Sequence, residues 1–300
     1  MEKERSITSL MSSFARAYHC ENEEFPVFSD TVARKLMTDD EYNMISNYVL
    51  GGISFFAPEK KDTFKDEKDA LRYLVNTHLA PTVLCRSAYC ERALKTLIAT
   101  GCEQYVILGA GLDTFAFRER EILKKCKVYE VDMPQTQNDK IQRLGRAKIS
   151  IPENLSFIGA DFTKDNIAQK LLENGFDKHK KTFFSYLGVS YYLYRDDIEN
   201  TLKTLSEIMS DGSEIVFDYA DSNLFMSKEK RVQNMIAMAK AGGEEMKSSF
   251  SYMSMELMLS DLGFLVYEHL TPSVIQKEII KNADMKAFEH INYVLAVKKM

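Results

Sequence analysis

The sequence contains no apolar run that approaches the roughly 18 residues needed to cross a membrane. Its first residues, Met1–Arg5, are charged and lack the apolar core of a secretory signal peptide. It also contains no long basic tract, and its net charge of −5 makes nucleic acid and anionic membranes poor partners. We therefore expect a cytoplasmic protein that binds neither.

Cysteine and histidine are scarce and scattered along the chain. The five cysteines are odd in number and form no C-x-x-C pair, which is typical of reduced cytosolic thiols. No pair of cysteines or histidines has the spacing of zinc ligands, so we expect no metal site.

What the chain does contain is ordinary for a soluble globular protein: 300 residues, 45% hydrophobic and 28% charged. Residues 1–100 have apolar residues at helical spacing and predict a helical N-terminal cap. Residues 101–300 alternate strand-like and helix-like runs and predict the core. Within this core we expect the methionine-rich segment 221–262 to form a helical lid, and the whole chain to fold as one compact unit.

Short runs rich in β-branched or aromatic residues predict seven strands, at 105–108, 127–132, 155–158, 182–187, 214–219, 264–270 and 292–297. Helical patterns fill the intervals at 115–125, 134–146, 164–174, 195–210, 228–240 and 253–263. This alternation predicts an α/β fold with a doubly wound, mostly parallel sheet covered by helices on both faces. Only a short segment separates the last two strands, which are expected to form an antiparallel edge pair.

A glycine turn marks the first candidate site. Gly109 and Gly111 follow the apolar run Tyr105–Leu108, where a ligand can approach the backbone closely at the carboxyl end of a strand. A full dinucleotide fingerprint would need a third glycine where the chain has Thr114, and Asp113 would repel a pyrophosphate. The turn therefore favours a nucleoside cofactor without phosphates, such as S-adenosylmethionine (SAM). A tight strand–helix turn with no ligand is the alternative.

Acidic residues follow the next two strands. Asp132 lies about twenty residues after the glycine turn, where a carboxylate can accept hydrogen bonds from both hydroxyls of a ribose. Its alternative role is the N-cap of the helix that begins near Pro134. Asp161 can accept a hydrogen bond from an adenine amino group while Phe162 packs on the ring, unless Asp161 only caps a helix.

An aromatic cluster follows the fourth strand, in the run 185–193. In a sheet of this kind, that position lies next to the reacting group. We expect Tyr191 and Tyr192 to form one wall of a substrate pocket, with simple packing as the alternative.

Several motifs together resemble those of the leucine carboxyl methyltransferase family. They are Arg86 with Glu91, the run Gln104–Arg118 with its G-A-G-L-D-T sequence, E-V-D-M-P at 130–134 followed by Lys140, and F-S-Y-L-G-V-S-Y-Y-L at 184–193. The most similar branch is bacterial and includes polyketide O-methyltransferases of the tetracenomycin type. That branch also matches Arg16-Ala17 and Phe28-Ser29-Asp30, so the resemblance covers about residues 10–220.

This resemblance implies a Rossmann-like, SAM-dependent methyltransferase fold with the strand order 3-2-1-4-5-7-6. It implies that Arg86, on the last N-terminal helix, pairs with the methionine carboxylate of SAM, and that Arg16 assists it. It further implies that the glycine turn lies under the cofactor, that Asp132 holds the ribose, and that residues 161 and 162 hold the adenine.

One position departs from the family. Many relatives carry glutamate where this chain has Leu187, so the substrate of the family cannot safely be carried over. Backbone carbonyls at 185–188 are one replacement for the missing carboxylate.

SAM-dependent O-methylation of a small molecule or a peptide is the leading functional hypothesis. A carboxylate acceptor is ionised at neutral pH, whereas a phenol or hydroxyl group needs a general base. His19, near Arg16, is the best candidate for a histidine base, with ordinary packing as its alternative role; Tyr191 and Tyr192 are the other candidates. The absence of an obvious base favours a carboxylate.

Two other functions remain as alternative hypotheses. One is a non-catalytic SAM-binding protein, which the Leu187 departure allows. The other is a nicotinamide-dependent oxidoreductase, which Thr114 disfavours because the pyrophosphate-binding glycine is missing.

Overall fold

The computed structural model describes residues 7–281 and 283–299. The charged residues Met1–Arg5, in which no signal peptide is expected, lie outside the described part. A central sheet has seven strands: β1 Gln104–Leu108, β2 Lys127–Asp132, β3 Leu155–Gly159, β4 Thr182–Tyr186, β5 Glu214–Ala220, β6 Phe264–Leu270 and β7 Ile291–Lys298.

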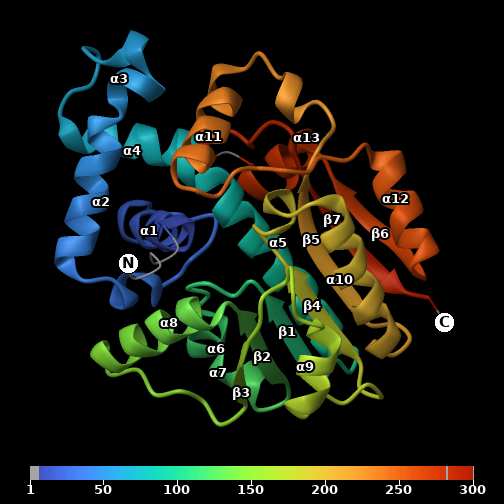
Figure 1. Cartoon of the computed structure of the whole chain (residues 1–300). Helices are drawn as coiled ribbons and strands as arrows, with labels where there is room; N and C mark the ends of the chain where they lie inside the picture. Colours follow the sequence, from blue (N-terminus) through green and yellow to red (C-terminus); the bar gives the residue numbers. More distant parts are fainter. Residues whose placement is uncertain (1–6, 282, 300) are drawn as a thin grey trace.

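The helices flank this sheet and form the N-terminal part of the chain (Figure 1). The α-helices are α1 Ile7–Asn22, α2 Asp39–Gly51, α3 Ile53–Phe56, α4 Glu67–Leu74, α5 Ala80–Ala99, α6 Phe115–Arg118, α7 Arg120–Leu123, α8 Pro134–Arg146, α9 Ile167–Glu173, α10 Arg195–Ile208, α11 Lys230–Ala241, α12 Tyr252–Asp261 and α13 Pro272–Ile275. Short 3₁₀ or π turns are η1 Ala33–Leu36, η2 Pro58–Lys60, η3 Val75–Leu79, η4 Ser190–Tyr192, η5 Leu224–Met226 and η6 Gln276–Ile280.

The strand order is β3-β2-β1-β4-β5-β7-β6, which confirms the expected order. The first five strands in this order are parallel, and β7 runs antiparallel to both β5 and β6. Leu108, the last residue of β1, is in register with Val131 of β2 and Tyr186 of β4. The loops after these three strands therefore open at the same edge of the sheet.

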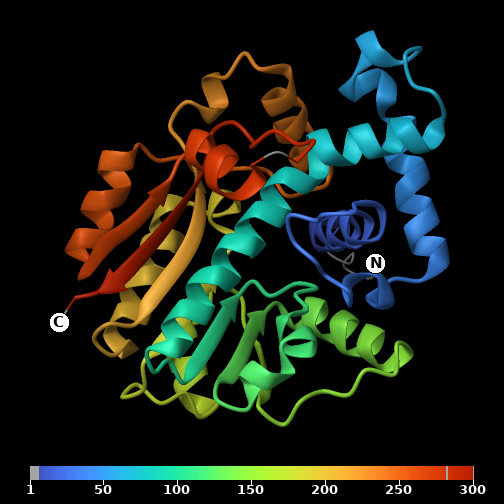
Figure 2. The ribbon, with the colours of Figure 1, turned by 180° about the vertical axis from the view of Figure 1, so that it is seen from behind.

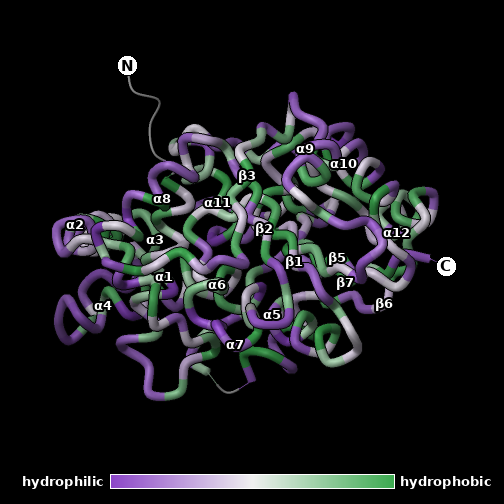
Figure 3. Tube along the Cα trace, turned by 90° about the horizontal axis from the view of Figure 1, so that it is seen from below, coloured by the Kyte–Doolittle hydropathy of each residue, from purple (hydrophilic) through white to green (hydrophobic). Residues whose placement is uncertain are grey.

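Each face of the sheet buries its own apolar core, because side chains alternate along a strand. In β1, Tyr105 and Ile107 join a core with α5 and the N-terminal helices, while Val106 and Leu108 join a core with α9, α10 and α12. Figure 2 shows α5 crossing one face, and Figure 1 shows α9 and α10 on the other. In Figure 3 the hydrophobic segments gather around the strands in the middle of the molecule.

The N-terminal helices assemble around α1. The side chains of Phe14, Ala15 and Ala17 are fully buried, because α5 and the turns η1 and η3 pack around this helix. Local sequence supports the next helix as well: Thr38 and Glu41 form a reciprocal capping box at the start of α2.

One predicted helix is wrong in detail. The single helix expected at 115–125 is two short helices, because Glu119 leaves the helical backbone conformation (φ −100°, ψ 48°). Elsewhere, Asp66 caps α4, which continues through the π turn η3 directly into α5. Asp30 precedes the single turn η1, where its carboxylate accepts hydrogen bonds from two backbone N–H groups.

The predicted lid segment 221–262 has two parts with different neighbours. Helix α12 packs on β6, whereas α11 contacts α3 in the N-terminal part of the chain. The division into cap, core and lid stays a prediction. No helix in the described part of the chain combines the length and the apolar character of a membrane span.

Candidate functional site

The glycine turn after β1 adopts backbone conformations that favour glycine. Gly109 has φ +71° and Gly111 has φ +50°. A side chain on Gly109 would overlap Val189, and a Cβ on Gly111 would lie 2.7 Å from the Ser9 hydroxyl. The turn therefore needs glycine for its conformation and for the close approach of its neighbours.

Asp132, at the end of β2, holds this turn in place. One carboxylate oxygen accepts a hydrogen bond from the N–H of Gly111, and the other accepts one from the N–H of Met133 at 2.7 Å. Burial raises the pKa of Asp132, although these N–H donors oppose the shift. The N-cap residue of α8 is Met133, so the alternative role predicted for Asp132 is wrong.

A buried ion pair lies on the same face of β2. Glu130 is fully buried and pairs with Lys140 of α8, which is 1% exposed. Burial raises the pKa of Glu130 to about 7, and Lys140 opposes the shift. This pair anchors α8 to the strand that carries Asp132.

A second buried ion pair joins α5 to β5. The Arg86 Nη1 lies 3.3 Å from the carboxylate of Asp218, which is fully buried, and 3.0 Å from the hydroxyl of Tyr191. Asp218 also accepts a 2.7 Å hydrogen bond from the N–H of Gly188. A side chain on Gly188 would overlap the Arg86 guanidinium, so this glycine makes room for the arginine.

Sequence reasoning missed Asp218. A signal was present, since Asp218 is the one acid inside the otherwise apolar interior of its strand, I-V-F-D-Y-A. An ionisable residue there needs a buried partner.

Two cavities meet at Arg86. The first, of about 560 Å³, is lined by the glycine turn, the carboxylate of Asp132, Phe162 and Leu187. The second, of about 450 Å³, is bordered by apolar side chains of α1, α2, α5 and α11. The residues that line both are Thr8, Ser12, Arg86, Gly188 and Tyr192. We refer to them below as the polar cavity and the apolar cavity.

The polar cavity is predominantly acidic. The carboxylates in its lining are Glu91, Asp113, Asp132, Glu244 and Glu245, and the cationic groups are Arg16, Arg86 and Lys247. Two of these three cations are already paired with buried carboxylates, Arg16 with Asp30 at 2.8 Å and Arg86 with Asp218. Such a lining fits a positively charged sulfonium cofactor better than a pyrophosphate.

Four predicted groups meet at the polar cavity: the glycine turn, Asp132, Phe162 and Arg86. Arg16 also borders it, but its Nε pairs with Asp30 and its Nη2 donates a 2.7 Å hydrogen bond to the Leu112 carbonyl. Its assisting role stays a prediction.

Two predicted residues are not brought to either cavity. The Asp161 carboxylate accepts hydrogen bonds from the N–H and hydroxyl of Thr163 and from Lys164, and these contacts lower its pKa to about 2. Its adenine contact stays a prediction. His19 is 2% exposed, and its Nε2 accepts a 2.9 Å hydrogen bond from the Val27 N–H. It lines neither cavity, and its role as a base stays a prediction.

The two predicted tyrosines lie where the cavities meet. Tyr191 lines the apolar cavity and Tyr192 lines both. Burial raises the pKa of each hydroxyl above its usual value. Both hydroxyls are therefore protonated at neutral pH, which makes them hydrogen-bond donors and poor general bases.

Comparison with known proteins agrees with this geometry. The sequence pattern of the leucine carboxyl methyltransferase family matches residues 9–206. The chain is 44% identical over 303 residues to YktD of Bacillus subtilis (strain 168), a protein named for SAM-dependent methyl transfer, with 99% of each chain covered. A Mycolicibacterium paratuberculosis protein with the same designation is 24% identical over 258 residues, covering 86% of this chain and 76% of its own.

Two solved structures share the fold at low sequence identity. A protein of the duf574 family from Streptomyces avermitilis MA-4680 has a TM-score of 0.57 and 15% identity, covering 85% of this chain and 95% of its own. A Thermobifida fusca YX structure described as a methyltransferase has a TM-score of 0.57 and 12% identity, covering 99% and 96%. Because the family pattern spans well over half of the sequence, this chain belongs to the leucine carboxyl methyltransferase family.

Proposed function

We propose that this protein is an O-methyltransferase that transfers the methyl group of SAM to the carboxylate of a largely apolar small molecule. That it is a SAM-dependent methyltransferase follows from its family and from its 44% identity to YktD over nearly the whole chain. The proposal concerns the acceptor. The observation that carries it is an apolar cavity that meets the polar cavity at a buried arginine and has no effective base at the junction.

The polar cavity has the groups that SAM requires. At about 560 Å³ it lies within the range of pockets for ligands of this size. Both Asp132 and Phe162 line this cavity, which supports the proposal that Asp132 accepts hydrogen bonds from the ribose hydroxyls and that Phe162 packs on the adenine. Arg86 has donors left for the methionine carboxylate, because only its Nη1 contacts Asp218 and Tyr191.

When bound, SAM supplies an electrophilic methyl group on a positively charged sulfur, so the protein itself must mainly align the acceptor. The apolar side chains around the second cavity exclude water and hold the acceptor in line, which is where the catalytic gain of such a site arises. Tyr192 and Arg86 border both cavities and can orient an acceptor oxygen by hydrogen bonds.

A carboxylate acceptor suits the groups at the junction. The residues shared by the two cavities include no histidine, aspartate or glutamate, and the tyrosine among them is protonated at neutral pH. A phenol or alcohol would have to lose its proton without a base, whereas a carboxylate is already ionised.

The type of bond that forms provides the test. The enzyme is incubated with methyl-tritiated SAM and a panel of apolar carboxylic acids and phenols, and the products are then treated with alkali. Methyl esters release volatile tritiated methanol under alkali, and methyl ethers do not. We expect alkali-released label with carboxylic acids; label that stays on phenols would contradict the carboxylate assignment.

A further inference from the structure

The apolar cavity has a second polar end, opposite Arg86. One face of α5 borders the cavity at Thr82, Val83 and Arg86, and Leu79 and His78 continue this line into the preceding turn η3. Arg86 is eight residues beyond His78, which corresponds to about 12 Å along a helix axis. The cavity therefore extends well away from the junction where methyl transfer is proposed.

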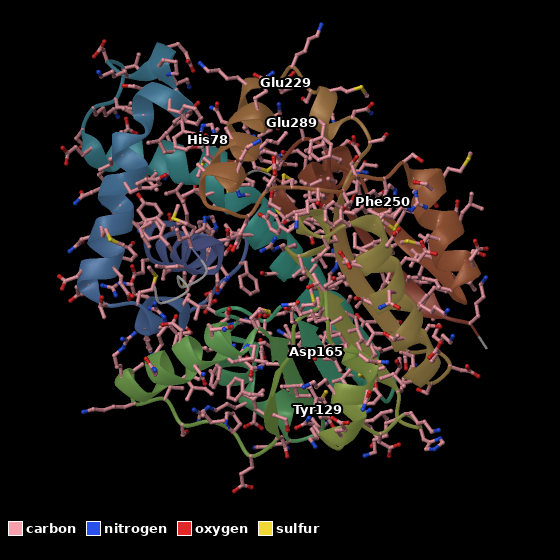
Figure 4. All side chains as sticks on the ribbon, in the orientation of Figure 1. His78, Tyr129, Asp165, Glu229, Phe250 and Glu289 are labelled. Carbon is pink, nitrogen blue, oxygen red and sulfur yellow. The ribbon has the colours of Figure 1, made fainter. Side chains whose placement is uncertain are left out.

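Arg231 of α11 lies at this distant end. It lines the cavity, its side chain is 11% exposed, and its charge acts on His78, whose pKa burial lowers to about 4. Figure 4 shows His78 and Glu289 on the same side of the molecule, beside the ribbon of α11. His78 is thus neutral at physiological pH, and Arg231 is the cation of this end.

The guanidinium of Arg231 is incompletely paired. Its Nη2 donates a 2.9 Å hydrogen bond to the Lys286 carbonyl, and its Cζ lies 4.6 Å from the centre of the Phe288 ring. Its Nε faces Glu289 Oε2 at 3.5 Å, but neither of these buried atoms has a hydrogen-bond partner within the described residues. Buried polar groups that lack hydrogen bonds cost free energy, so the charge of this guanidinium is weakly compensated by the protein.

The neighbouring carboxylate does not remove this positive charge. Glu289 is shared with Lys286, whose Nζ lies closer, at 2.8 Å. Glu59 also acts on His78, but it belongs to the exposed turn η2. Burial lowers the pKa of Arg231, as expected for a cation that has lost more hydration than its neighbours replace.

We propose that the acceptor carries a second anionic group, a carboxylate, which Arg231 binds at the far end of the apolar cavity. The acceptor class is then an elongated molecule with an apolar body, a carboxylate that is methylated near Arg86, and another that remains free. This inference rests on the proposed ester-forming function and adds to it the specificity-determining role of Arg231.

Two probes that differ only in the distal carboxylate test it: decanedioate and decanoate, titrated by calorimetry into the protein saturated with S-adenosylhomocysteine. We expect decanedioate to bind the wild type at least about tenfold more tightly, as for one charge-assisted hydrogen-bonded pair. The preference should disappear in Arg231→Met and return in part in Arg231→Lys. Arg120→Met, the same change at an exposed arginine of α7, should keep it.

A fourth variant protects the test against a folding defect in Arg231→Met. Glu289→Gln removes the carboxylate nearest the Arg231 Nε, so it should strengthen decanedioate binding a few-fold and leave decanoate binding unchanged. Equal affinity of the wild type for the two probes, or an equal preference in Arg231→Met, would overturn the inference. If the enzyme forms methyl esters but binds decanedioate no more tightly than decanoate, only the role of Arg231 is contradicted. If it prefers decanedioate but forms no methyl ester, the proposed function is contradicted.

Discussion

The guanidinium of Arg86 lies 3.3 Å from the fully buried carboxylate of Asp218, at the point where the polar and the apolar cavities meet. Asp218 lines neither cavity. It therefore acts on a ligand through its neighbours, and its charged partner among them is Arg86, whose guanidinium it holds above Gly188.

A double-mutant cycle tests this positioning role. Asp218→Asn and Arg86→Met should each weaken the binding of S-adenosylhomocysteine, measured by calorimetry. The double variant should bind no more weakly than Arg86→Met alone, because the charged partner through which Asp218 acts is already absent from that single variant. Glu214→Gln, at the other end of β5, is the control that should bind normally. Additive losses would show that Asp218 acts independently of Arg86.

Gly188→Ala should damage both stability and cofactor binding. Its backbone has φ +73°, which costs an L-residue about 1–2 kcal/mol, and the added methyl group would displace the Arg86 guanidinium. Gly212→Ala is a matched control, because Gly212 has φ +71° but its Cβ would meet no atom closer than 3.6 Å. Chemical denaturation should show a lower free energy of unfolding for both variants than for the wild type. Only Gly188→Ala should lose affinity for S-adenosylhomocysteine, and equal affinities would refute the steric argument.

The pair of Glu130 and Lys140 should give stability an unusual dependence on pH. The pKa of Glu130 is raised from its usual value to about 7, so the folded protein binds this proton more tightly than the unfolded chain. The stabilisation of the fold by Glu130 is therefore fully present below the pKa that this residue has in the unfolded chain, and it is lost as pH rises to about 7. The double variant Glu130→Gln/Lys140→Met removes the group without leaving an unpaired lysine.

Urea denaturation at about pH 5 and about pH 8 measures this effect. From about pH 5 to about pH 8, the free energy of unfolding of the wild type should decrease relative to that of the double variant. A constant difference between the two proteins would mean that Glu130 is ionised throughout this range.

Tyr192→Phe should retain most of the catalytic rate. Burial keeps this hydroxyl protonated, so it can orient an acceptor but cannot take its proton. Loss of an orienting hydrogen bond should lower kcat by less than about tenfold, whereas loss of a general base typically costs about 100-fold or more. A drop of the larger size in steady-state assays would indicate that the acceptor is a phenol or alcohol.

The fold and much of the polar cavity could be predicted from the sequence because their signals are local. Gly109, Gly111 and Asp132 directly follow apolar strands, and the parallel register brings the ends of those strands together. The strand order itself came from the family resemblance, and the sheet has that order.

What could not be predicted depends on contacts between distant segments. The role of Asp218 follows from its contact with Arg86, which lies 132 positions earlier in the chain. Asp161 shows the opposite case: its position after a strand suggested a ligand contact, but its carboxylate is engaged by its own turn at Thr163 and Lys164. The apolar cavity is assembled from α1, α2, α5 and α11, so no single stretch of sequence reveals it.

The central claim is that the polar cavity binds SAM through Asp132. Calorimetric titration of the wild type and of Asp132→Ala with SAM and with NAD tests it most directly. We predict that the wild type binds SAM and not NAD, and that Asp132→Ala binds SAM at least about tenfold more weakly, because the ribose loses its charged acceptor. Binding of NAD without SAM, or an unchanged SAM affinity in Asp132→Ala, would contradict the account.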